Sequence, residues 1–449
     1  MSQISKIKYS DIQEAKRFDA EYFKPEYLRE LNILKNYQTK NIGDFAFITD
    51  GQHGYHEVDN NSEISHLTAR HMKNWFAINE DADRLAKWVD DKNKRSSLEE
   101  GDIIISTRGS VGYSALVTKE VLPANIDQDV ARIKINSDSN IISTFLLVYL
   151  NSYFGQNWIS KNTTGMVQQG LSLEKVRQIK IPILPQSFQI QIEKIVKEAY
   201  EKQNQSKLLY KEAEEILLKE LGLLNYEIKH TLAFGTTKKE IDEAGRYDSE
   251  YFQPKYKEII KRVESYSGGF DTVENIVNFK DRNFFPKENE KYKYLALSNI
   301  SSRGYVQDFQ EEIGKNLPSR ARRKINTGDV VISSIEGSLS SCALIEVEFN
   351  NFICSTGFFV INSEKINSET LLILFKSKII QELLGRGSKG TILTAISKSE
   401  LEKIKIPLID SKIQKQIAEK IQESHRLRKE SKGLLEEAKR KVEEEIEKR

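Results

Sequence analysis

The chain has 449 residues, of which 39% are hydrophobic and 30% are charged, and its formal net charge is +2. Because a single hydrophobic core rarely serves more than about 250–300 residues, we expect several domains. The small net charge excludes a uniformly basic nucleic-acid binder, so any DNA-binding surface must be local. No apolar run approaches the roughly 20 residues that span a bilayer, and the N-terminus lacks a secretory apolar segment. We therefore expect a cytoplasmic protein without membrane contact.

The first half of the chain predicts a mixed α and β domain. Pro25 is placed to open a helix in the segment EYLRELNILKNY. Short β-branched runs punctuated by glycine follow between residues 40 and 135 and predict strands, and residues 142–159 predict helices. After IKIP at 179–182, apolar residues recur every three or four positions from Phe188 among lysines and glutamates. This pattern predicts a long helix with a narrow apolar seam.

The second half repeats the first. The segment RFDAEYFKPEY at 17–27 matches RYDSEYFQPKY at 246–256 at seven of eleven positions. The order continues, because GDIIIS at 101–106 is matched by GDVVIS at 328–333, and IKIP recurs at 404–407 before a second charged helix. Motifs that recur in the same order indicate a duplication of one unit.

The two long helices are expected to pair with each other. Both seams carry small residues in register, including Ala199, Ser206 and Ala213 in the first and Ser424, Ser431 and Ala438 in the second. Antiparallel pairing within the chain buries both seams, although each helix packing on its own domain, or self-association between chains, remains an alternative. We expect an α+β fold of two similar domains with an internal pseudo-twofold duplication. The expected segments are 1–185 (first domain), 186–222 (first helix), 223–410 (linker and second domain) and 411–449 (second helix).

These motifs, in this order and in two copies, resemble the specificity subunits of type I restriction-modification systems. The resemblance implies that each variable domain is a target recognition domain that reads one half of a split double-stranded DNA sequence. It implies that the helices set the spacing and dock two adenine-N6 methyltransferase subunits, which use S-adenosylmethionine, and that restriction/translocase subunits join this core. The chain itself is then not an enzyme and needs no cofactor. Because the two domains differ outside the shared motifs, the two half-sites should differ.

Polar loops near the predicted strand ends supply candidate DNA contacts. Phosphates are bound by Arg, Lys, Ser, Thr and backbone amides, and base edges are read by Arg, Lys, Asn and Gln. The run SRARRK is the densest basic cluster outside the long helices. The candidates in the first domain are Gln52, His53, Tyr55, Thr68, Arg70, Lys73, Thr107, Arg108, Ser110, Gln168 and Gln169, and those in the second are Ser298, Asn299, Arg320, Arg322, Arg323, Ser338 and Lys389.

Catalytic and metal motifs are not found. The chain has no Pro-Pro pair, so it lacks the Asn/Asp-Pro-Pro-aromatic segment that holds a flipped adenine. The glycines at 385 and 390 have P-loop spacing, but Thr391 stands where the lysine should be. His53, His56, His66 and His71 have no metal-ligand spacing, so no metal site is expected. Two other functions remain open: a scaffold that binds no DNA, and a DNA reader of a different methylation or phage-defence complex.

Overall fold

The computed structural model describes residues 4–15, 17–73, 75–163, 170–301, 303–389 and 394–448. The chain forms two compact units, and each long helix contributes to both. The first unit comprises residues 1–204 and 428–449, and the second comprises 205–427. No helix among the described residues combines the length and the apolar composition that a membrane span requires.

The first unit is built on a sheet that is covered on both faces. Strand β7 alternates its side chains, since Ile103 and Ile105 pack in one hydrophobic cluster and Ile104 in another. The first cluster includes helix α4 (Ser143–Asn151), of which seven of nine residues are buried, so this largely apolar helix lies inside the unit. The order of the main sheet is β2 (Ala46–Asp50), β10 (Val130–Ile135), β7 (Ile103–Ser106), β8 (Ser114–Leu116), β5 (Phe76–Ala77) and β4 (Met72–Lys73).

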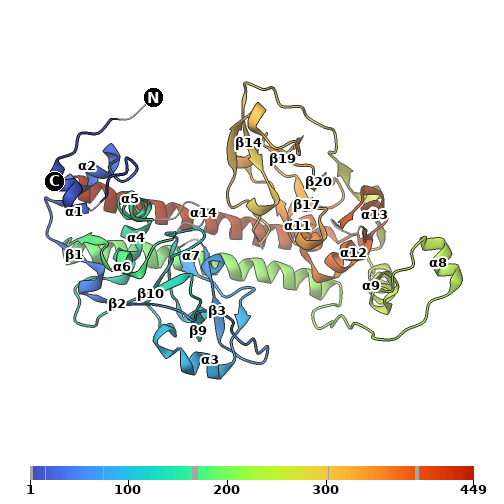
Figure 1. Ribbon diagram of the computed structural model, residues 1–449. Helices are drawn as coiled ribbons and strands as arrows, with labels where there is room; N and C mark the ends of the chain where they lie inside the picture. Colours follow the sequence, from blue (N-terminus) through green and yellow to red (C-terminus); the bar gives the residue numbers. More distant parts are fainter. Residues whose placement is uncertain are drawn as a thin grey trace. The chain divides into compact units, whose positions relative to one another are not determined.

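A smaller sheet packs against the second cluster. Its order is β6 (Asp83–Arg84), β3 (Ser65–Leu67) and β9 (Ala124–Ile126), and β3 runs parallel to β9 and antiparallel to β6. Strand β1 (Thr39–Asn41) pairs with β11 (Lys180–Pro182), which contains the first IKIP motif. The helices are α1 (Tyr9–Ala15), α2 (Pro25–Leu34), α3 (Lys87–Lys92), α4 (Ser143–Asn151), α5 (Tyr153–Asn162) and α6 (Leu173–Arg177) (Figure 1).

The second unit repeats the core of this topology with a shorter main sheet. Val330 and Ile332 of β17 face one hydrophobic cluster and Val331 faces another, as in β7. The four-stranded sheet is β13 (Asn278–Phe279), β20 (Phe358–Asn362), β17 (Val330–Ser333) and β18 (Cys342–Leu344), and the other is β15 (Gln310–Ile313), β14 (Lys291–Leu295), β19 (Ile353–Ser355) and β16 (Ala321–Lys324). Two short pairs are β12 (Phe270–Thr272) with β23 (Lys405–Pro407), and β21 (Ser388–Lys389) with β22 (Ala395–Ile396). The helices are α8 (Lys238–Ala244), α9 (Pro254–Glu264), α10 (Val273–Ile276), α11 (Ser368–Lys376), α12 (Lys378–Gly387) and α13 (Lys398–Glu402).

The aspartate of the repeated Gly-Asp motif has the same role in both units. Asp102 accepts a hydrogen bond from the Glu99 amide (2.7 Å) and is paired with Arg132 of β10 (2.6 Å). Asp329 accepts the equivalent bond from the Asn326 amide (2.8 Å) and is paired with Lys280 (2.7 Å). Both aspartates are buried, so each needs its turn amide and its cation. The motif is therefore a fold determinant.

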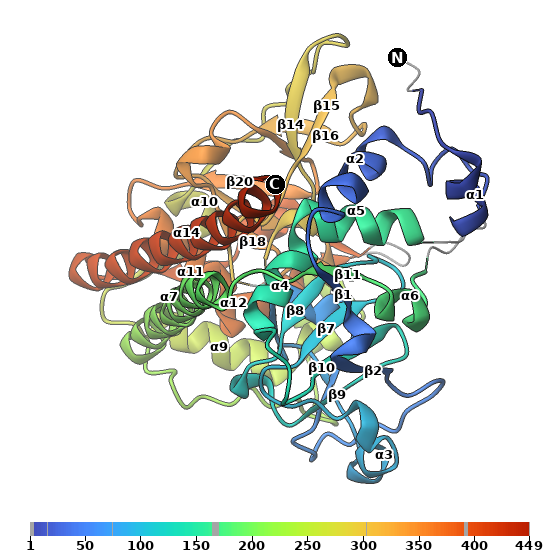
Figure 2. The same cartoon turned by 90° about the vertical axis from the view of Figure 1, so that its left-hand side faces the viewer.

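Within each unit the long helices α7 (Gln186–Glu220) and α14 (Ser411–Glu447) pair antiparallel, and their ribbons lie side by side (Figures 1 and 2). In the first unit the Ser431 hydroxyl donates to the Ala199 carbonyl at 2.7 Å. In the second, Ser206 and Ser424 each donate a hydroxyl to the other's carbonyl, at 2.7 and 2.8 Å. The predicted pairing of small residues within the chain is confirmed. The helices also pack on the globular parts, because Ile192 of α7 belongs to the core of the first unit and Ile417 of α14 to that of the second.

Candidate nucleic-acid interface

Three of the predicted DNA-binding loops of the first unit meet around residues 127–129. The Gly51 amide donates to the Asp127 carbonyl (3.1 Å), the Asp127 amide to Leu67 (3.2 Å), and the Thr107 amide to the Asp129 carbonyl (2.8 Å). A Cβ atom on Gly51 would lie 1.7 Å from the Ile126 carbonyl oxygen, so only glycine fits there. We call residues 51–56, 67–71, 107–110 and 127–129 the first loop surface.

The segment after Gly51 presents an exposed aromatic residue. Tyr55 is 88% exposed, and its ring stacks on that of His56. The Gln52 amide group donates to the Tyr55 carbonyl (2.8 Å), which closes the loop. His53 is exposed, and its Nε2 lies 2.8 Å from Asp50. Tyr55 and His53 therefore remain at the surface as predicted, whereas Gln52 is engaged in shaping the loop.

The two predicted arginines of this surface are exposed and partly held by neighbours. Arg70 donates to the Asp81 carbonyl at 2.9 Å, and Arg108 forms an ion pair with Asp129 at 3.2 Å. Ser110 is exposed next to Arg108. An arginine held in this way loses less side-chain entropy when it binds a phosphate or a base edge.

Thr107 and Thr68 are placed differently from the prediction. Thr107 is buried and its backbone carbonyl accepts from Leu171, so its side chain is not a surface contact. Thr68 begins a short 3₁₀ turn, and its amide donates to His71 Nδ1 at 2.9 Å. Both residues therefore shape the loops, and contact of the Thr107 loop with DNA stays a prediction.

Carboxylates on the first loop surface and beside it were not among the predicted residues. Asp50 binds both His53 and Arg95, the latter at 3.3 Å. Burial raises the pKa of Asp127 to about 6. Because carboxylates accept hydrogen bonds from the cytosine amino group, they belong to the set of possible base readers. In the sequence, the polar segment that precedes β10 could have drawn attention to Asp127 and Asp129. That segment does not reveal where their side chains point.

The equivalent loops of the second unit carry smaller side chains. Asn299 is buried and its side-chain oxygen accepts from the Ala296 amide (2.8 Å), the same role that His71 has in the first unit. The buried side chain of Asn299 therefore shapes the turn, and its contact with DNA stays a prediction, while the neighbouring Ser298 is exposed. The Ser338 hydroxyl is bonded to that of Ser333 at 2.9 Å.

Basic side chains of β16 stack on aromatic rings that the sequence analysis did not single out. The Arg322 guanidinium lies 5.0 Å from the Phe285 ring centre, and the Lys324 ammonium lies 4.3 Å from that of Phe284. Phe285 is 69% exposed. Exposed aromatic faces and guanidinium groups are the groups on which nucleic-acid bases stack and phosphates bind. We call Phe284, Phe285, Arg320, Arg322 and Lys324 the basic–aromatic patch.

Other predicted residues are less accessible or lie outside the described part of the chain. Arg323 is half-buried, and its Nε has no hydrogen-bond partner among the described residues. Gln168 and Gln169 fall outside the described residues. The backbone of Lys73 and of Lys389 is described, but their side chains are not.

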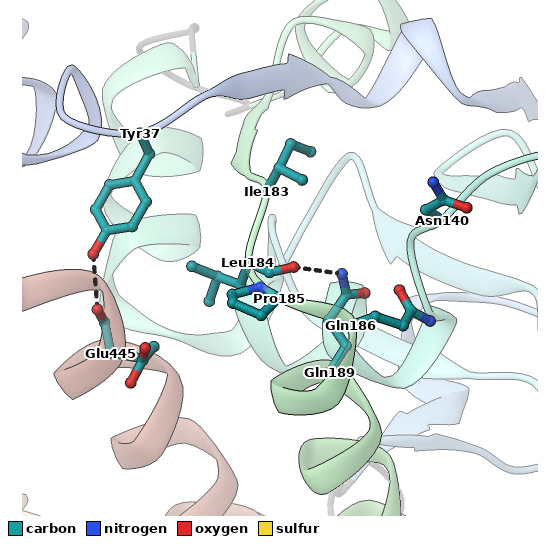
Figure 3. Close-up of a pocket in the computed structure, with 8 residues that line it drawn as sticks. All are labelled: Tyr37, Asn140, Ile183, Leu184, Pro185, Gln186, Gln189 and Glu445. Atoms are coloured by element: carbon teal, nitrogen blue, oxygen red, sulfur yellow. Dashed lines mark hydrogen bonds between the residues drawn. The ribbon is translucent and has the colours of Figure 1, made fainter.

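A pocket of about 560 Å³ lies where the first unit meets the start of α7 (Figure 3). Figure 3 shows the Tyr37 hydroxyl directed at the Glu445 carbonyl, to which it donates at 2.8 Å, and Gln189 bonded to the Leu184 carbonyl at 3.1 Å. Gln189 also accepts from the Ile142 amide, and in the second unit Gln414 accepts from the Asn367 amide. The repeated glutamine thus fastens each long helix to its unit. The pocket therefore lies among contacts that attach the long helices to the rest of the first unit.

Comparison with known proteins gives one family. The model of the type I restriction modification DNA specificity domain matches residues 9–215 and again 238–440. The chain is 24% identical over 442 residues to the type I restriction enzyme MjaVIII specificity subunit of Methanocaldococcus jannaschii, covering 94% of this chain and 95% of that protein. It is 27% identical over 100 residues to the EcoBI specificity subunit of Escherichia coli, covering 22% and 21% of the two chains.

Among solved structures, the type I restriction-modification S subunit from M. genitalium aligns over 91% of this chain and 96% of its own, with 15% identity and a TM-score of 0.44. The family model matches both halves of the chain, which agrees with the duplicated topology of the two units. The chain therefore belongs to the type I restriction-modification DNA specificity family.

Proposed function

We propose that this chain is the DNA-reading specificity subunit of a type I restriction-modification complex, and that each unit reads one half of a bipartite, asymmetric target in double-stranded DNA. The observation that carries the proposal is the double match to the specificity-domain model. Fold likeness alone would leave function open, because one fold hosts many functions. Family membership together with polar, loop-built surfaces on both units favours sequence reading.

The chemistry of the two surfaces supports unlike half-sites. The first loop surface combines Arg70 and Arg108 with carboxylates and an exposed tyrosine. The basic–aromatic patch combines cations with two phenylalanines. Because base edges are distinguished by the pattern of donors and acceptors presented to them, two such different surfaces should select different bases.

The long helices are proposed to fix the spacing and to dock partners. Helix α7 has 35 residues, so it is about 50 Å long, the rise of about 15 base pairs. Its apolar seam is buried against α14, so its charged outer face is available to other proteins. We expect two adenine-N6 methyltransferase subunits to dock there and restriction/translocase subunits to join them. Catalysis would reside in those subunits, the complex would act in the cytoplasm, and this chain would contribute recognition alone.

Selection from a random pool of duplexes tests the proposal. The chain, purified with its methyltransferase partners, should enrich one motif made of two defined blocks separated by a spacer of fixed length. Substitution of Arg108 by alanine should relax the block that the first unit reads and leave the other block unchanged. A scaffold without a DNA function would enrich no motif, and that outcome would refute the proposal.

A further inference from the structure

Three potential metal ligands of the first unit meet although they are far apart in sequence. One ligand atom from each of His56, His66 and Asp83 lies within 4.8 Å of the other two. His66 on β3 is the register partner of Asp83 on β6, so the sheet itself brings these two side chains together. His56 approaches from the loop after Gly51, and the two imidazole ring centres are 4.0 Å apart. The spacing of the histidines along the chain gives no sign of this cluster.

The state of His66 is a second and independent observation. Its side chain is only 3% exposed, and its Nδ1 is buried without a hydrogen-bond partner among the described residues. A buried polar atom that lacks a partner is destabilising, so such atoms are rarely left without compensation.

The donor set selects the class of ion. Two imidazole nitrogens and one carboxylate oxygen are ligands typical of Zn²⁺, which completes a tetrahedron with a fourth ligand such as water. Bonds of about 2.0–2.2 Å would place the ligand atoms about 3.4 Å apart, so binding requires them to close by about an ångström. His56 lies in a loop and Asp83 is exposed, so both can make that adjustment against the buried His66.

We propose that the first unit binds one Zn²⁺ through His56, His66 and Asp83. The ion would fasten the loop that carries Gln52, His53 and Tyr55 to strands β3 and β6, and so order the first loop surface. The described residues of the second unit form no equivalent site, because Tyr294 and Gln310 form the corresponding register pair of β14 and β15. The stoichiometry is therefore one ion per chain.

The test is a titration of the full chain, stripped with a chelator, with Zn²⁺ and with Co²⁺ as a spectroscopic probe. We expect one equivalent of Zn²⁺, a tetrahedral Co²⁺ spectrum and a rise in the melting temperature of the first unit. His56→Ala and Asp83→Asn should each weaken binding by about 100-fold or more, because each removes a direct ligand. Both residues lie outside the core, so circular dichroism should show these variants folded.

His53→Ala is the matched control, since it removes an exposed histidine from the same loop that pairs with Asp50 instead. It should leave Zn²⁺ affinity unchanged. Absence of a one-to-one complex, or equal affinity in the native, His56→Ala and Asp83→Asn chains, would overturn the proposal. Metal binding is read without DNA, so these results are independent of the proposed function.

Discussion

Replacement of Arg132 by methionine should destabilise the first unit by about 3–5 kcal/mol, because it leaves a buried carboxylate without its cation. The side chains of Arg132 and Asp102 are each 4% exposed, and the guanidinium also donates to the Arg95 carbonyl at 3.1 Å. Burial raises the pKa of Asp102 even with Arg132 beside it. Without the cation this pKa should rise further. A carboxyl group whose pKa is higher in the folded chain stabilises folding at a pH below its pKa in the unfolded chain, and this stabilisation is lost as the pH rises through the folded pKa. The loss of unfolding free energy caused by Arg132→Met should therefore grow from acid to neutral pH.

Urea unfolding of the full chain, with hydrogen exchange followed on the amides of β7 and β10, measures this change within the first unit. Lys134→Met is the matched control, because Lys134 lies on the same strand and binds Glu99, which Arg132 also contacts. Lys134 is 44% exposed, so its loss should cost less than about 1 kcal/mol. Equal costs for the two variants, or a penalty for Arg132→Met that does not depend on pH, would refute the reasoning.

Three further changes test other parts of the structure. Ser206→Leu should destabilise the helix pair by about 1–3 kcal/mol in urea unfolding, because the seam has no room for a larger side chain, whereas Leu208→Ala at an exposed position should change stability by less than about 0.5 kcal/mol. Burial raises the pKa of Glu30 to about 7. The protonated carboxyl group therefore stabilises the folded chain at acid pH, and this stabilisation is lost as the pH rises through 7. Glu30→Gln should therefore raise the melting temperature above pH 7 and not at acid pH; the same rise at both would contradict this. Arg322→Ala should lower DNA affinity in a titration and reduce the slope of log K against log salt by about one, and an unchanged slope would exclude a phosphate contact.

The fold was largely predictable because its strongest signals are local. The run Ile103–Ile105 and its counterpart in the second half have the apolar character of strands covered on both faces, and the small residues at Ala199, Ser206 and Ser431 marked the helix seams. The duplication added a check, since each element had to occur twice in the same order. Each unit contains one globular part and about half of each long helix. This division could not be predicted, because the apolar periodicity continues without a break along each helix.

The site was less predictable because its chemistry depends on contacts between distant segments. Thr107 and Asn299 are polar residues in loops, but backbone pairing carries them into the interior. Phe285 becomes a candidate contact only through its packing with Arg322 of β16, and Asp83 only through its register with His66. Composition and spacing contain no information on such pairings, and polar loop residues of both kinds look alike in the sequence.

Mapping of adenine methylation across the genome of cells that express this chain with its methyltransferase partners is the most direct test of the central claim. With the chain present, methylation should appear at one motif of two unlike blocks and a fixed spacer, and exchange of the second unit for that of a relative should change one block and leave the other. Methylation that is unaffected by removal of the chain, or a single uninterrupted motif, would contradict the account.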